Sequence, residues 1–129
     1  QGEAGREEGL MEEALTALLR PLAPTHWSMA PQGSARPFIV LTRVSGGRDY
    51  TLDGLSSPRP ARVQADVYGD TALSTKALAR RLVAEVSGRR VGAITAIFVD
   101  SERDLPGPDA TGQATRFRTA IDLMVHFTL

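Results

Sequence analysis

Apolar and polar residues alternate strictly along one stretch near the middle of the chain. From position 61 to position 68 the sequence reads ARVQADVY, in which every second residue is apolar. Successive side chains on a strand point to opposite faces, so this period of two predicts a half-buried strand. Its apolar face would contribute to the core, and its polar face would carry Arg62, Gln64, Asp66 and Tyr68.

After Gly69 the period changes to that of a helix. Leu78, Leu82 and Val86 recur at helical spacing between positions 71 and 87, with arginines between them. Asp70 stands where a helix N-cap is expected, and Gly88 stands where a glycine often ends a helix. We expect this helix to fold back over the apolar face of the strand that precedes it.

The remaining elements follow from the same two periods. We expect a helix from Leu10 to Arg20, ended by Pro21 and Pro24. Extended segments are predicted at 25–29, 37–44, 91–100 and 117–127, with a long polar loop at 101–115.

This order of elements predicts an α+β fold. It consists of a twisted, mainly antiparallel sheet of four to five strands with two helices packed on one face. Residues 1–10 are expected to be a disordered extension, and residues 11–129 a single domain.

Composition narrows the classes of function. The 15 basic and 15 acidic residues cancel, which gives no bulk attraction to nucleic acid or to an anionic membrane. Aromatic residues make up only 5% of the chain, which disfavours a surface for stacking bases. The chain has no cysteine, which excludes disulfides and thiolate chemistry. No apolar run approaches the roughly 20 residues that span a bilayer.

Candidate catalytic and metal-binding residues are few and do not form a known constellation. The two histidines, His26 and His126, belong to no metal-binding motif. Asp66 and Asp122 lie on polar strand faces, but arginines accompany both: Arg62 accompanies Asp66, and Arg116 and Arg118 accompany Asp122. Cross-strand ion pairs explain this pattern more simply than acid–base catalysis. We therefore assign no catalytic, cofactor-binding or metal-binding residue.

Two other hypotheses remain open at this point. In the first, the chain is a small α+β ligand-binding or enzymatic domain with Asp66, Asp122, Arg62 and His126 lining a pocket. In the second, it is a nucleic-acid-binding module, which the zero net charge disfavours.

Several segments, taken in order, resemble the tail-completion (tail-terminator) proteins of long-tailed phages and gene transfer agents. They are MEEAL at 11–15, APQG at 30–33 followed by RPFIV at 36–40, TLDG at 51–54, ARVQADVY at 61–68, and the ending from Arg116 through Asp122 to His126. The resemblance covers nearly the whole chain from Met11, so it implies that 11–129 is one tail-terminator-like domain.

The resemblance implies a structural role in a virion and no enzymatic activity. Such proteins form a ring, commonly of six subunits, at the head-proximal end of the tail tube, where the ring stops tube polymerisation. The implied partners are further copies of the chain, the tail tube protein and a head–neck connector or stopper protein, without a cofactor or a membrane. The implied location is the virion tail or neck, after assembly in the cytoplasm of a bacterial host.

The polar strand faces are the predicted place for contacts in such a ring. Arginine is enriched in protein interfaces, and these faces carry several arginines. A lumen lined by basic side chains could also contact passing DNA non-specifically. The residues predicted to lie at a subunit interface or to line the lumen are Arg43, Arg48, Arg62, Gln64, Asp66, Arg116, Arg118 and Asp122.

Overall fold

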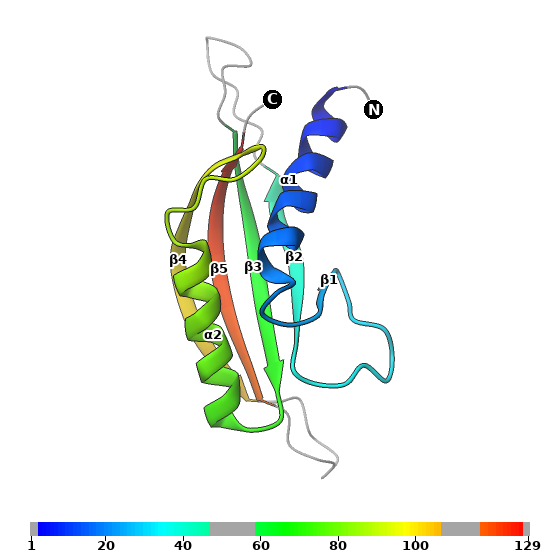
Figure 1. The fold of residues 1–129 in the computed structure, drawn as a ribbon, viewed down its shortest axis with the longest axis vertical. Coiled ribbons are helices and arrows are strands. Elements are labelled where there is room, and N and C mark those ends of the chain that lie inside the picture. Colours follow the sequence, from blue (N-terminus) through cyan, green and yellow to red (C-terminus); the bar gives the residue numbers. More distant parts are fainter. Residues whose placement is uncertain (1–2, 47–58, 107–116, 128–129) are drawn as a thin grey trace.

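A computed structural model describes residues 3–46, 59–106 and 117–127. It contains two helices and five strands (Figure 1). In chain order these are α1 (Glu3–Leu19), β1 (Thr25–Trp27), β2 (Phe38–Gly46), β3 (Arg59–Gly69), α2 (Ala72–Val86), β4 (Ile94–Pro106) and β5 (Phe117–Phe127).

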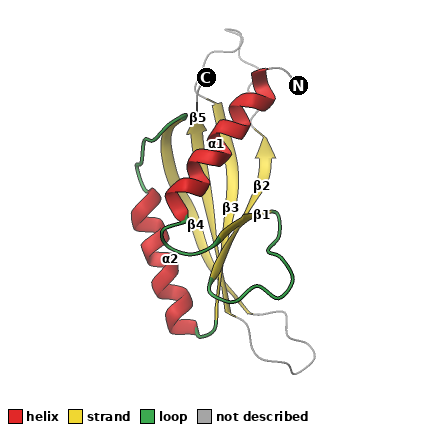
Figure 2. Ribbon diagram, turned by 45° about the vertical axis from the view of Figure 1, so that its right-hand side comes forward, coloured by secondary structure: helices red, strands yellow, loops and turns green. Residues whose placement is uncertain are grey.

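The strands form one open sheet in the order β1-β2-β3-β5-β4. β1 runs parallel to β2, and every other neighbouring pair is antiparallel. Both helices lie against the same face of this sheet (Figures 1 and 2). The predicted α+β class, with a mainly antiparallel sheet and two helices on one face, is confirmed.

The core lies between the sheet and the two helices. On β3 and β5 the apolar residues of the alternating pattern are buried in directly opposed pairs, such as Val63 with Leu123 and Ala65 with Ile121. Met11, Leu15 and Leu19 of α1 cover this face over one part of the sheet, and Leu78, Leu82 and Val86 of α2 cover another. All the named leucines, valines and isoleucines except Leu78 have no exposed surface, while Leu78 retains 6%.

Helix α2 begins one residue later than Asp70 would place it. Thr71 is the N-cap: its hydroxyl accepts a hydrogen bond from the Ser74 backbone N–H at 3.0 Å, and the Ser74 side chain completes a capping box. Asp70 instead accepts a hydrogen bond from Arg36 Nε at 2.9 Å. The prediction of Asp70 as the cap was wrong, because the side chains of Thr71 and Ser74 each accept a hydrogen bond from the backbone N–H of the other. Gly88 has φ of +70°, as predicted for a glycine that ends a helix.

Two element boundaries also differ from the prediction. Helix α1 starts at Glu3, whereas the sequence predicted a start at Leu10.

Strand β4 continues to Pro106, so the segment predicted as a polar loop from residue 101 is strand for its first six residues. Pairing with β5 supports these polar residues in an extended conformation despite their weak strand propensity. Residues 107–116 of the predicted loop lie outside the described residues.

In the part of the chain that the structure describes, no helix has both the length and the apolar character needed to span a membrane.

Candidate functional site

The face of the sheet opposite the two helices has no described helix over it, and we call it the open face. Pairing in register arranges its side chains in rows that cross the strands. Five of the eight predicted contact residues lie there together: Arg62, Gln64 and Asp66 on β3, and Arg118 and Asp122 on β5.

The other three predicted residues are not part of the described open face. Arg43 is directly opposite Val63, whose side chain is in the core, so Arg43 lies on the helix-covered side. There Arg43 Nη1 lies 3.7 Å from Glu12 Oε2 of α1. Arg48 and Arg116 lie outside the described residues. The sequence misplaced Arg43 because only the pairing register fixes which side of β2 each residue occupies.

Asp66 is the most buried charged group on the open face, with 6% of its surface exposed. Gln64 Nε2 donates to both carboxylate oxygens of Asp66 at 3.1 Å. Arg118 Nε lies 3.5 Å from Asp66 Oδ1, which makes an ion pair without a hydrogen bond to that nitrogen. Buried charges need such partners, because removal from water is costly.

The other charges of the open face are also paired with each other. Arg62 Nη1 donates to Asp100 Oδ2 at 2.8 Å. Asp122 accepts from Ser101 Oγ at 2.7 Å and from Arg103 Nη1 at 3.1 Å. The expected cross-strand ion pairs are therefore present, but Asp66 pairs with Arg118 and Asp122 pairs with Arg103, not with the arginines nearest to them in the sequence.

Strand geometry explains the different partners. Residues four apart on one strand are separated by roughly 13 Å, whereas residues directly opposite on neighbouring strands are about 5 Å apart. Arg103 and Ser101 are on β4, which pairs with β5 beside Asp122. The sequence does not reveal this neighbour, since β4 was predicted to end at residue 100.

A row of rings crosses the open face at the end nearest the N-terminus of α2. The rings of Phe38 and Tyr68 stack with centroids 5.0 Å apart, and His26 of β1 meets Phe38 edge-on at 6.3 Å. The Arg118 guanidinium carbon lies 5.9 Å from the centroid of the Tyr68 ring. This row links four strands by side-chain contacts and restricts the motion of Arg118.

The open face does not form the pocket that the enzymatic hypothesis requires. Arg62, Asp122 and Asp66 occupy three successive rows, roughly 7 Å apart along the strands, and each binds a different partner. His126 lies one row beyond Arg62 and makes an edge-on contact with Phe98 at 5.6 Å. Within the described ranges, no cluster of three or more histidine or acidic side chains could hold a metal ion.

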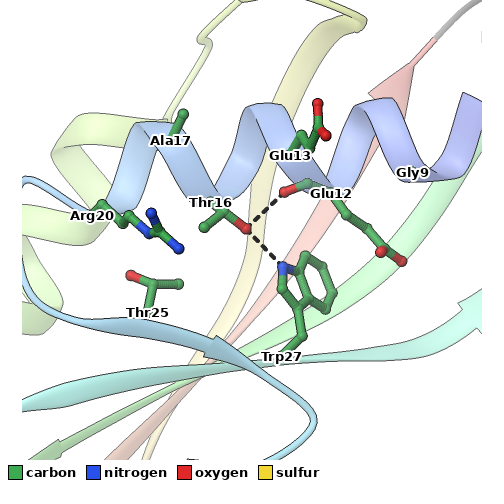
Figure 3. A pocket seen from close by; sticks show the side chains of 8 residues that line it. All are labelled: Gly9, Glu12, Glu13, Thr16, Ala17, Arg20, Thr25 and Trp27. Carbon is green, nitrogen blue, oxygen red and sulfur yellow. Dashed lines mark hydrogen bonds between the residues drawn. The ribbon is translucent and has the colours of Figure 1, made fainter.

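A groove of about 480 Å³ lies on the other side of the sheet, between α1 and β1 (Figure 3). Trp27 of β1 points to α1, and its Nε1 donates to Thr16 Oγ1 at 2.7 Å. Thr16 Oγ1 in turn donates to the Glu12 carbonyl at 2.8 Å. Arg20 and Thr25 lie at the far end of the groove. The groove therefore follows the outer edge of the sheet at β1.

A smaller cavity of about 100 Å³ lies between the start of α2 and the ends of β4 and β5. Asp104 lines it, and its Oδ2 is 2.8 Å from Lys76 Nζ. Thr119 Oγ1 donates to Asp104 Oδ1 at 3.0 Å. The hydrogen bond from Lys76, followed by that from Thr119, lowers the pKa of the Asp104 carboxyl from its ordinary 3.8.

Replacing Asp104 by Asn is expected to reduce the acid sensitivity of the fold. The folded-state pKa of Asp104 is lower than its unfolded value, so its contribution is complete above the ordinary pKa of 3.8. That contribution is lost as the pH falls through the folded-state pKa. The difference in unfolding free energy between the wild type and Asp104→Asn should therefore shrink from about pH 5 to about pH 2 in urea titrations. Glu13→Gln is the control, and a difference that stays constant over this range would contradict the assignment.

The family model described as tail completion protein gp17 matches residues 10–123. A solved chain from the virion of a native gene transfer agent particle has 14% sequence identity and a TM-score of 0.65, with 94% of this chain and 96% of that chain covered. A second solved chain has 17% identity and a TM-score of 0.59, over 100% of this chain and 98% of the other. No curated protein matches.

At these sequence identities the two solved chains show a shared fold alone. The family model spans most of the sequence and therefore shows the family. The resemblance on which the sequence interpretation rested is confirmed by this match. The chain therefore belongs to the tail completion protein gp17 family and is a structural protein of a phage-like tail.

Proposed function

We propose that the chain forms a closed ring, of six copies, at the head-proximal end of a tail tube. The ring ends polymerisation of the tube protein and offers its other side to a head–neck connector or stopper protein. It performs no chemical reaction. Residues 11–129 form the assembling domain, and assembly takes place in the cytoplasm of the bacterial host.

The open face carries this proposal. A sheet face without a covering helix normally packs against another protein surface or stays in contact with water. Here the acidic groups Asp66, Asp122 and Asp100 already have arginine partners within the same chain. A face whose charges are internally neutralised needs no oppositely charged partner surface, and it suits the solvated wall of a lumen.

In this proposal the predicted contact residues of the open face belong to the lumen wall. Arg62, Gln64, Asp66, Arg118 and Asp122 line it, and Arg48 and Arg116 are further candidates from the sequence. Because Arg62 and Arg118 of the wall, and Arg103 of the neighbouring β4, are paired with carboxylates, contact with passing DNA is non-specific and weak.

The ring is tested by combining mass measurement with electron microscopy. We expect light scattering of the purified chain, alone or with tail tubes, to give a species of about six times 13.8 kDa. Micrographs should show annular particles and tubes closed at one end, and tubes supplied with the chain should stop growing. The Val63→Asp variant, which is expected not to fold, is the negative control: tubes supplied with it should continue to grow. A chain that remains monomeric with tubes present and leaves tube growth unchanged would overturn the proposal.

A further inference from the structure

The two edges of the sheet lack strand partners within the described residues. β4 forms one edge, and 11 of its 13 residues pair with β5. On its outer side the backbone of Ile94 is bonded to Val91 and the Ile97 carbonyl accepts from the Gly88 N–H, whereas no described strand lies beside residues 98–106 there. At the other edge, β1 pairs with only three residues of β2, namely 39–41, so residues 42–46 of β2 pair with β3 but have no described strand on their outer side. Long open edges present unpaired N–H and C=O groups that template pairing with another strand.

Exposed hydrophobic side chains occur at both edges. Phe98 of β4 is 56% exposed, and Val44 of β2 is 53% exposed. Met29, which lies two residues after the end of β1, is 74% exposed. Large apolar side chains placed at an open strand edge favour burial by a partner.

The two edges differ in charge. β4 carries three acidic residues and one arginine, whereas residues 25–46 carry two arginines and no acidic residue. Glu102 of β4 and Arg20 beside β1 are exposed and form no ion pair within the described part of the chain. Asp100, Asp104, Arg36 and Arg43 are paired within the chain, whereas Glu102 and Arg20 remain available for one ion pair between copies.

We propose that β4 of one copy lies along the β1–β2 edge of the next copy, so that the sheet continues from subunit to subunit. The occupant of the open edge is thus a second copy of this chain, and this inference rests on the proposed ring. Because each copy has one edge of each kind, the contact is head-to-tail and closes into a ring when the rotation between copies fits.

The consequence concerns the open face. When sheets join at their edges, the open faces of all copies form one continuous wall, and none of its residues has to be buried between subunits. The groove between α1 and β1 lies beside the contact and gives room for the side chains of the incoming β4 (Figure 3).

Cross-linking of single-cysteine variants tests this contact, because the native chain has no cysteine. Val44→Cys and Phe98→Cys, at exposed positions on the open-face side of the two edge strands, are made separately, mixed in the presence of tail tubes, and treated with a short bismaleimide. We expect a covalent dimer from the mixture and none from either variant alone, since a head-to-tail contact never brings two identical positions together. A chain carrying both cysteines should give a ladder that ends at the size of the closed ring.

Controls separate this inference from the ring itself. Ala84→Cys, on the exposed side of α2, should not cross-link with Val44→Cys, whereas cross-linking through Gln64→Cys would place the open face in the interface. Rings that assemble without the 44–98 cross-link, or that cross-link through position 64, overturn the edge contact and leave the ring in place. A chain that stays monomeric with tubes present overturns both proposals.

Discussion

An aspartate in place of Val63 is expected to prevent folding. Val63 is fully buried near the middle of β3, opposite Leu123 of β5, in the layer that α1 and α2 cover. A carboxylate there would lose its hydration without a partner, at a cost of several kcal/mol, in addition to the roughly 1.5–3 kcal/mol lost with the valine side chain. That total is comparable to the whole free energy of unfolding of a typical domain, about 5–15 kcal/mol.

Circular dichroism and urea unfolding measure this effect, and the neighbouring residue provides a matched control. Arg62→Asp introduces the same side chain one position earlier, on the open face, where Arg62 is paired with Asp100. Loss of a largely exposed ion pair costs only about 0–1 kcal/mol, so this variant should fold. Leu82→Asp in α2 should behave as Val63→Asp does. A Val63→Asp chain that unfolds at the wild-type urea concentration would contradict the placement of the core.

Replacing Gly69 by Ala is expected to destabilise the junction of β3 and α2 by about 1–3 kcal/mol. A Cβ atom on Gly69 would overlap Thr75 Oγ1 and would lie 3.2 Å from the Thr75 Cα atom. Thr75 is 2% exposed, and its hydroxyl donates to the Thr71 carbonyl at 2.6 Å. The new methyl group has to displace this hydroxyl, which also weakens the first turn of α2.

A double-mutant cycle with Thr75→Ala isolates this clash. Without the hydroxyl, the cost of Gly69→Ala should fall, since only the 3.2 Å contacts to Thr75 Cα and Cβ remain. Gly9→Ala in α1 is the opposite control: no atom lies within 4 Å of its Cβ, so this variant should gain about 0.5–1 kcal/mol of helix stability. Equal costs of Gly69→Ala in both Thr75 backgrounds, measured by urea unfolding, would show that the hydroxyl is not the obstacle.

The candidate contact surface was predicted only in part. Alternation along 61–68 and 117–127 correctly placed Arg62, Gln64, Asp66, Arg118 and Asp122 on one face, because both strands keep a strict period of two. Their partners were not predicted, since Asp100, Ser101 and Arg103 belong to a strand that pairs with β5 from its far side. Phe98 lies in the extended segment predicted at 91–100, and only its place in the edge strand of the sheet shows that it faces solvent.

Irregular pairing of β4 explains why residues 101–106 were predicted to be part of a loop. Its register against β5 shifts twice, between Ile94 and Ala96 and between Val99 and Ser101. A β-bulge places one extra residue in a strand and reverses the alternation beyond it. Residues 101–106 therefore have no continuous period with residues 94–99, and strand propensity alone could not identify them.

The sequence by itself determined which segments are helical or extended and which sides of β3, β5 and α2 are apolar. Those properties depend on local periods of 2 and 3.6 residues, which each segment carries within itself. It also carried enough ordered similarity to indicate the tail-completion family. The tertiary structure alone decided that β5 lies between β3 and β4, that Arg43 faces α1, and that β4 and the β1–β2 side form the open edges. These depend on pairing between segments far apart in the chain, where one shift of register exchanges the two faces of a strand.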